Sequence, residues 1–117
     1  MIKGNELFGA HIRRLREEHD LGLREMAKKI GVSPTYLSKV ERDEFAPPAE
    51  DKVRAIAEVF GSDIDELLAL AGRVSSDLTD IIRRHPVELS ALLRTAQGMS
   101  AAEIAGLAKK ARRTKDG

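Results

Sequence analysis

The 117-residue sequence contains no cysteine and no tryptophan, and its aromatic residues are three Phe and one Tyr. The absence of cysteine excludes a disulfide framework and a thiolate metal site, and it fits a reducing cytosol. With so few aromatic residues, the core has to be built from Leu, Ile, Val, Ala and Met, which favours helices over a β-sandwich. A chain of this length can bury one sizeable core.

Long apolar runs are also missing. No stretch of about 18 consecutive apolar residues could span a bilayer, and the opening residues MIKGNELF lack the apolar region of a secretory signal. The three histidines have no HExxH spacing, and GxSxG and Gly-rich phosphate loops are absent. We therefore expect a soluble cytoplasmic protein with no membrane contact, no metal, no cofactor and no enzymatic activity.

Charge of one sign does not dominate, because the formal net charge is only +1. Such a chain would not coat nucleic acid indiscriminately, so any binding must come from a local patch. The basic side chains that could form one are Arg24, Lys28, Lys29, Lys39 and Arg42. Acidic residues gather later in the sequence, at Glu50, Asp51, Glu58, Asp63, Asp65 and Glu66.

The spacing of apolar residues predicts five helices in roughly the first 70 residues. We expect Asn5 to cap the first helix, whose apolar face begins with Leu7 and Phe8 and which ends near 20–22. The second runs from Leu23 to Ile30, and the third follows it. The fourth ends at Gly61. The fifth opens with Asp63 and Glu66 at the spacing of a capping box and closes at Gly72.

The stretch MAKKIGVSPTYLSKVE, residues 26–41, predicts two helices held at a steep angle. Gly31 can adopt the left-handed conformation that ends the second helix, and Ser33 with Pro34 is a favourable start for the third. Ala27 must be small because the third helix crosses close over it. This arrangement leaves polar side chains together on the solvent side of the third helix.

These residues resemble the helix-turn-helix of phage Cro and repressor proteins, also called the xenobiotic-response-element family. The resemblance covers roughly Leu7 to Leu70 and rests on Ala27, Gly31, the segment SKVER and the segment IAEVFGSDIDELL. It implies an all-α chain with a five-helix lambda-repressor-like domain, whose third helix enters the DNA major groove. It also implies a salt bridge between Arg16 and Glu41.

The resemblance further implies two sets of DNA-contacting residues. The base-facing set is Pro34, Thr35, Ser38 and Lys39. The phosphate-facing set is Arg24, Lys28, Ser33, Tyr36 and Arg42. For Lys39, a guanine contact, a phosphate contact and a purely solvated side chain all remain open.

Three features depart from the family pattern. Gly22 and Leu23 replace the usual Ser or Thr and the Gln that grips a phosphate, and Arg24 is the candidate substitute. The loop after the third helix carries Asp43 and Glu44 where basic residues are common, and these acids would repel a nearby phosphate. Pro34 offers only a small apolar surface to a base. In the same loop, we expect Phe45 to plug the core under the fourth helix.

Three short helices are predicted beyond a boundary near 73–76. We assign 1–73 to the DNA-binding domain, 74–112 to a C-terminal helical region and 113–117 to a disordered basic tail. The C-terminal region concentrates apolar residues, which we expect to form a dimer interface, although packing within the chain is the other interpretation. These residues are Leu78, Ile81, Ile82, Leu89, Leu92, Leu93, Ile104 and Leu107.

The hypothesis from the sequence is a bacterial or phage transcriptional regulator associated with the nucleoid. It would bind double-stranded DNA as a homodimer on an inverted-repeat operator and act as a repressor. One alternative is an antitoxin that represses its own operon and binds a toxin through the C-terminal helices. The other is a protein-interaction module that keeps the fold but does not bind DNA.

Overall fold

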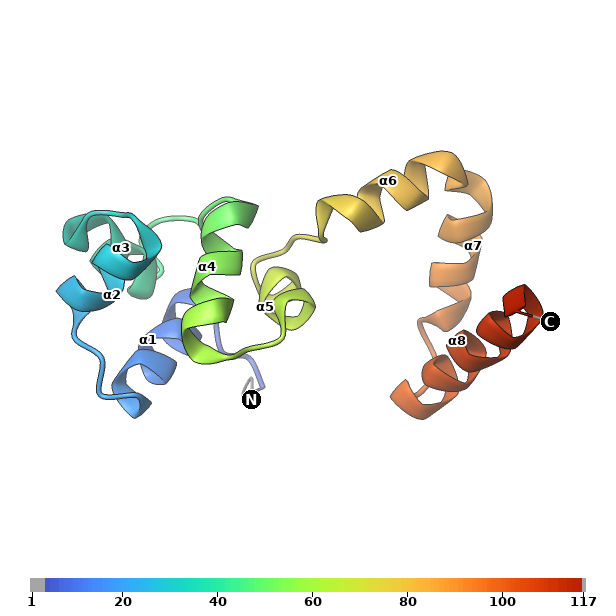
Figure 1. The fold of residues 1–117 in the computed structure, drawn as a ribbon, viewed down its shortest axis with the longest axis horizontal. Helices are drawn as coiled ribbons and strands as arrows, with labels where there is room; N and C mark the ends of the chain where they lie inside the picture. The colour runs from blue at the N-terminus through green and yellow to red at the C-terminus, as the bar shows by residue number, and fades with distance from the viewer. Residues whose placement is uncertain (1–3, 117) are drawn as a thin grey trace. The chain divides into compact units, whose positions relative to one another are not determined.

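The computed structural model describes residues 4–116. In this part of the chain the secondary structure consists of eight α-helices without a strand, which confirms the predicted all-α class. The chain divides into two compact units, Met1–Ser75 and Ser76–Gly117. Figure 1 labels the helices of both units.

The first unit contains five helices around a single core (Figure 1). Each helix contributes at least one fully buried side chain, and examples from the five in order are Ile12, Met26, Leu37, Ile56 and Leu68. The core is therefore almost entirely aliphatic, as the shortage of aromatic residues predicted. The helices are α1 (Phe8–Glu18), α2 (Leu23–Ile30), α3 (Pro34–Glu41), α4 (Glu50–Phe60) and α5 (Ile64–Leu70).

The junction between α2 and α3 has the predicted geometry. Gly31 ends α2 in the left-handed conformation with φ +75°, and the Val32 N–H donates to the Ala27 carbonyl over 3.0 Å. The Gly31 N–H also donates to the Lys28 carbonyl, over 3.3 Å. The two bonds satisfy the last carbonyls of α2 as in a Schellman motif. Ser33 then caps α3, because its Oγ accepts the Tyr36 N–H at 3.1 Å. Ala27 is completely buried between the two helices.

The start of α1 differs from the prediction. The helix begins after Leu7, which has no capping side chain and is 62% exposed, so neither the Asn5 cap nor the buried Leu7 is observed. The Asp43 carboxylate instead accepts the N–H groups of Gly9 and Ala10 at 2.8 and 3.2 Å. A Cβ on Gly9 would lie 2.6 Å from Asp43 Oδ1, so the glycine permits this approach. A cap supplied from 34 positions away leaves no local signal at the helix start.

Arg16 and Glu41 join α1 to the end of α3. Arg16 Nε and Nη2 donate to the two Glu41 oxygens at 2.7 and 2.9 Å, and Nη1 donates to the Leu21 carbonyl at 3.0 Å. The Glu41 side chain is only 3% exposed, and its hydrogen bond to Arg16 raises the arginine pKa above its ordinary value. The predicted salt bridge is confirmed, and it fixes the orientation of α3 on the core.

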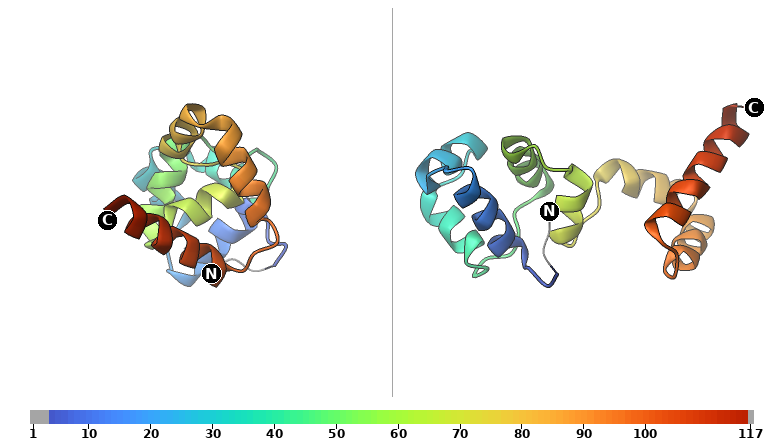
Figure 2. Two further views of the ribbon diagram at one scale, coloured as in Figure 1. Left: turned by 90° about the vertical axis from the view of Figure 1, so that its right-hand side faces the viewer. Right: turned by 90° about the horizontal axis from the view of Figure 1, so that it is seen from below.

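The second unit is built from α6 (Ser76–Arg84), α7 (Pro86–Ala96) and α8 (Ala101–Asp116), and none of the three helices has a buried residue. A short connection joins α7 to α8, and the two form a V (Figure 2). A capping box formed by Ser100 and Glu103 opens α8. Ser100 N donates to Glu103 Oε1 at 2.9 Å, and Glu103 N donates to Ser100 Oγ at 3.1 Å.

The end of α8 also differs from the prediction. The helix includes 113–116, which belong to the predicted disordered tail, while residue 117 lies outside the described residues. The residues that lead into this stretch, AKKARR at 108–113, all have high helix propensity, so the helix continues through it. The basic side chains therefore continue an exposed helix.

Candidate nucleic-acid interface

The exposed face of α3 carries all four predicted base-facing residues. Leu37, Val40 and Glu41 are buried against the core, whereas Thr35 is exposed and Pro34, Ser38 and Lys39 are partly exposed. The helical repeat explains this division, because residues three or four positions apart share a face. The remainder of the first unit thus leaves this side of α3 open to a partner.

A shallow hollow brings the start of α2 against this face of α3. Its volume is about 260 Å³, and its lining combines predicted base-facing and phosphate-facing residues with one apolar side chain. The lining residues are Leu23, Arg24, Pro34, Thr35, Ser38 and Arg42. Arg24 therefore lies beside α3, next to the position where the family pattern has its phosphate-gripping Gln. This arrangement can offer a guanidinium to a phosphate and hydroxyls to the edges of bases.

Two phosphate-facing candidates lie one turn apart on α2. Arg24 and Lys28 are both exposed, and neither forms an ion pair with another described residue. Lys28 also lies in the last turn of α2, where a cation is favourable to the helix dipole. Lys52 of α4 donates its Nζ to the Gly31 carbonyl over 3.5 Å, which adds a positive charge at the turn between α2 and α3. No local sequence pattern predicts this contact.

Phe45 occupies a different place from the one predicted. It is 44% exposed and does not plug the core, and Pro48 is the buried residue of this loop. The Glu44 and Phe45 N–H groups both donate to the Lys39 carbonyl, at 2.9 and 3.3 Å, which folds the loop back against the end of α3. The Phe45 ring consequently packs beside α3 instead of beneath α4.

Tyr36, Lys39 and Phe45 form a small cluster at the surface, which we call the aromatic shelf. The rings of Tyr36 and Phe45 have centroids 5.9 Å apart, and Lys39 Nζ lies 5.1 Å from the Phe45 centroid. This distance is within the range of a cation–π interaction, which restricts where the ammonium can go. Lys39 is therefore positioned by a loop residue, and no periodicity in the sequence indicated that.

The two acids of the loop have separate functions. Asp43 is turned toward α1, where it caps the helix, so its charge is compensated by amide N–H groups. Glu44 Oε2 lies 3.0 Å from Arg42 Nη2 in an ion pair whose side chains are both about half exposed. Such pairs are weak, so a DNA phosphate could displace Glu44 from Arg42.

The Ser33 hydroxyl oxygen accepts the cap bond of α3, while its hydrogen is still available to a phosphate.

No helix in the described part of the chain is both long and apolar enough to span a bilayer. Among residues 4–116, no three His, Cys, Asp or Glu side chains are grouped to hold a metal ion.

Comparison with known proteins supports the fold and the family. Residues 12–67 match the helix-turn-helix family model. The biofilm regulator SinR, solved in complex with DNA, is 31% identical over 53% of this chain and 98% of its own, with a TM-score of 0.49. The DNA-binding domain of the P22 c2 repressor is 27% identical over 56% of this chain and 86% of its own, with a TM-score of 0.50.

A likeness in fold extends into the second unit. The SinR protein/SinI protein complex aligns with 95% of this chain and 100% of its own at 23% identity, with a TM-score of 0.50. No sequence among curated proteins matches the chain. The helix-turn-helix match, the buried Arg16–Glu41 pair and the open face of α3 lead to one conclusion: the chain belongs to the Cro/repressor-type helix-turn-helix family of DNA-binding transcriptional regulators.

Proposed function

We propose that this regulator binds a specific double-stranded DNA sequence as a homodimer and represses transcription from an inverted-repeat operator. The observation that carries the proposal is the shared surface of Arg24, Thr35 and Ser38 on the exposed side of α3. Steric exclusion of RNA polymerase would follow from occupancy of the operator. The protein would act in the cytoplasm, at the nucleoid.

The first turns of α3 would read the bases. Thr35 and Ser38 can donate to or accept from base edges, and Pro34 offers an apolar contact to a thymine methyl group. Lys39 donates to a guanine or to a phosphate, and the aromatic shelf limits its reach. Arg24, Lys28 and Arg42 anchor the domain to phosphates, with Ser33 and Tyr36 as supporting hydroxyl donors.

The second unit would form the dimer interface. Several of its large apolar side chains are between 38% and 58% exposed in the single chain, namely Leu78, Ile81, Leu92, Leu93, Ile104 and Leu107. Ile82 and Leu89 are partly exposed. A second copy of this chain can cover these residues, and a twofold dimer presents two α3 helices to half-sites about 34 to 36 Å apart.

The test combines selection of bound duplexes from random DNA with salt titration of the selected site. Specific binding predicts that the logarithm of affinity falls steeply with the logarithm of salt concentration, and that Arg24→Ala lowers the slope by about one. Lys39→Ala should cost about 1 to 3 kcal/mol at particular base positions. A flat salt dependence with no preferred sequence would favour the interaction module.

The antitoxin is a second candidate, because the exposed apolar residues of the second unit could also receive another protein. Co-expression with the product of an adjacent small gene separates the two functions. A toxin should co-purify with the chain and be released by changes in α7, whereas a simple repressor should purify as a dimer of itself.

A further inference from the structure

The two units of the chain carry formal charges of opposite sign. Residues 1–75 contain 12 Lys and Arg against 14 Asp and Glu, which gives a net charge of −2. Residues 76–117 contain 8 Lys and Arg against 5 Asp and Glu, which gives a net charge of +3. The unit that presents α3 is therefore repelled by the DNA polyanion as a whole, and the excess of positive charge lies in the second unit.

Most of this excess is concentrated in the second half of α8. Residues 109–116 include five cations and a single acid, Asp116. The cations are Lys109, Lys110, Arg112, Arg113 and Lys115, and all five are exposed. None of these five side chains forms an ion pair with another described residue.

Many arginines of the first unit are paired, in contrast to the cations of α8. Those with a carboxylate partner are Arg13, Arg14, Arg16, Arg42 and Arg54. Each of these guanidinium groups has to give up a carboxylate before it can bind a phosphate. The cations of α8 can bind an anion without breaking any bond in the chain.

The α8 helix separates its cations from its apolar residues. Ile104, Leu107 and Ala111 follow the helical repeat along one face. Lys109 and Arg113 project from the other side, about 160° and 200° around the helix from Ala111. These two cations lie one turn apart, and like charges at this spacing repel each other. A polyanion bound across this face would remove the repulsion.

The composition of the second half of α8 favours a nucleic acid over a lipid surface. Interfacial membrane helices bury Trp, Phe or Leu side chains opposite their cations. After Leu107, α8 has no apolar side chain larger than alanine, so this half has nothing to insert into a bilayer. Residues 109–115 span about 9 Å of helix, a length over which one strand of DNA presents about three phosphates.

We propose that the basic half of α8, residues 109–115, binds the phosphate backbone of double-stranded DNA. Lysine and arginine donate to phosphate oxygens without reading bases, so this contact adds affinity and no sequence preference. It also compensates for the net negative charge of the first unit. This inference rests on the proposed function, because it takes the DNA bound by α3 as the partner of α8.

The experiment measures binding of the full chain to a random-sequence duplex over a series of salt concentrations. The variant combines Lys109→Gln with Arg113→Gln, which removes two charges and keeps α8 helical because Gln has a similar helix propensity. The slope of log affinity against log salt should fall by about two for each bound chain. Between about 50 and 200 mM salt, the affinity of the unchanged protein should therefore fall about tenfold further than that of the variant.

The matched control combines Arg83→Gln with Arg84→Gln. It removes the same charge from the second unit, but on α6, where Asp77 and Asp80 balance the two arginines. We expect little change in the slope from this control. Circular dichroism of both variants measures whether their helices are retained.

Three results would overturn the inference. They are an unchanged slope for the α8 variant with its helix intact, an equal decrease in both variants, and tighter binding to vesicles of phosphatidylserine and phosphatidylcholine than to the duplex. Selection of bound duplexes tests the proposed function separately. A preferred sequence with an unchanged slope would refute only this inference, whereas a reduced slope with no preferred sequence would refute only the proposed function.

Discussion

At the scale of single residues, the position of Lys39 depends on a neighbour outside α3. Phe45 lies under the Lys39 ammonium, so we expect Phe45→Ala to release the lysine and broaden base preference at the position that Lys39 contacts. The salt slope should stay unchanged, because no cation is lost. Competition binding with operators varied at single base pairs measures the preference. If Phe45→Ala left the ranking of bases as it was, the shelf would have no part in recognition.

Glu44 provides a second prediction at this scale. Its ion pair with Arg42 is half exposed and competes with a phosphate for the guanidinium. We therefore expect Glu44→Gln to strengthen DNA binding by about twofold to fivefold at low salt, as for other exposed pairs, with less effect at high salt. Glu58→Gln, an exposed acid on α4, is the control for net charge. Equal gains in both variants would point to general charge instead of the Arg42 pair.

At the scale of helices, the Arg16–Glu41 pair holds α3 to α1. Glu41→Gln leaves the Arg16 charge 15% exposed and without its carboxylate, so we expect the free energy of unfolding to fall by about 3 kcal/mol. Chemical denaturation measures the loss. The control is Glu17→Gln, whose pair with Arg13 spans 3.5 Å on the surface and should contribute less than about 1 kcal/mol. A similar small loss in both variants would contradict a structural function for Glu41.

The capping box of α8 makes the start of this helix sensitive to acid. Hydrogen bonds from the Ser100 backbone and then its hydroxyl lower the pKa of Glu103 below its ordinary value of 4.5. A lowered pKa in the folded state means that the stabilisation is present above 4.5 and is lost as the pH falls through the folded value. NMR shifts of 101–104 should lose helical character in that window. Glu103→Gln should abolish this pH dependence, and persistence of the transition would assign it to another group.

At the scale of the whole molecule, the function of the chain depends on what covers the second unit. Its helices bury no residue by themselves, and Leu93 on α7 is 58% exposed. We expect Leu93→Glu to convert the proposed dimer to monomers in sedimentation and to weaken operator binding, because each monomer then engages only one half-site. Ala91→Glu introduces a charge at an exposed position of α7 about 200° around the helix from Leu93 and from Leu89, and should leave the dimer intact. An unchanged mass distribution for Leu93→Glu would exclude this interface.

The amino-acid sequence by itself determined the helices and the turn of the first unit. Local signals suffice for them: the period of the apolar residues, Gly31 as a left-handed stop, and Ser33 with Pro34 as a helix start. The family resemblance added the Arg16–Glu41 pair, whose geometry the structure confirms. The DNA-contacting residues remain predictions, although the structure places the base-facing set on the open side of α3.

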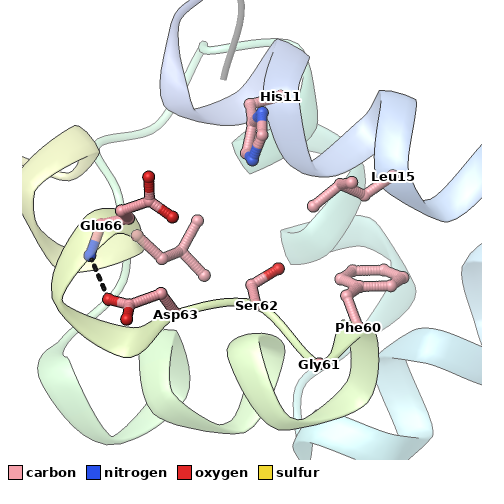
Figure 3. A pocket seen from close by; sticks show the side chains of 8 residues that line it. His11, Leu15, Phe60, Gly61, Ser62, Asp63 and Glu66 are labelled. Atoms are coloured by element: carbon pink, nitrogen blue, oxygen red, sulfur yellow. Dashed lines mark hydrogen bonds between the residues drawn. The ribbon is translucent and has the colours of Figure 1, made fainter. Parts of the chain in front are cut away.

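Only the tertiary structure decided the features that depend on residues far apart in the chain. Asp43 caps α1 from the loop after α3, and Phe45 packs beside Lys39 instead of in the core. Glu66 of α5 faces His11 of α1 across a hollow between these helices (Figure 3). Spacing along a helix indicates which face a side chain occupies, but not which residues of another element contact it. Capping, cation–π contact and enclosure of a cavity are all through-space interactions, so they became visible only after the helices had packed.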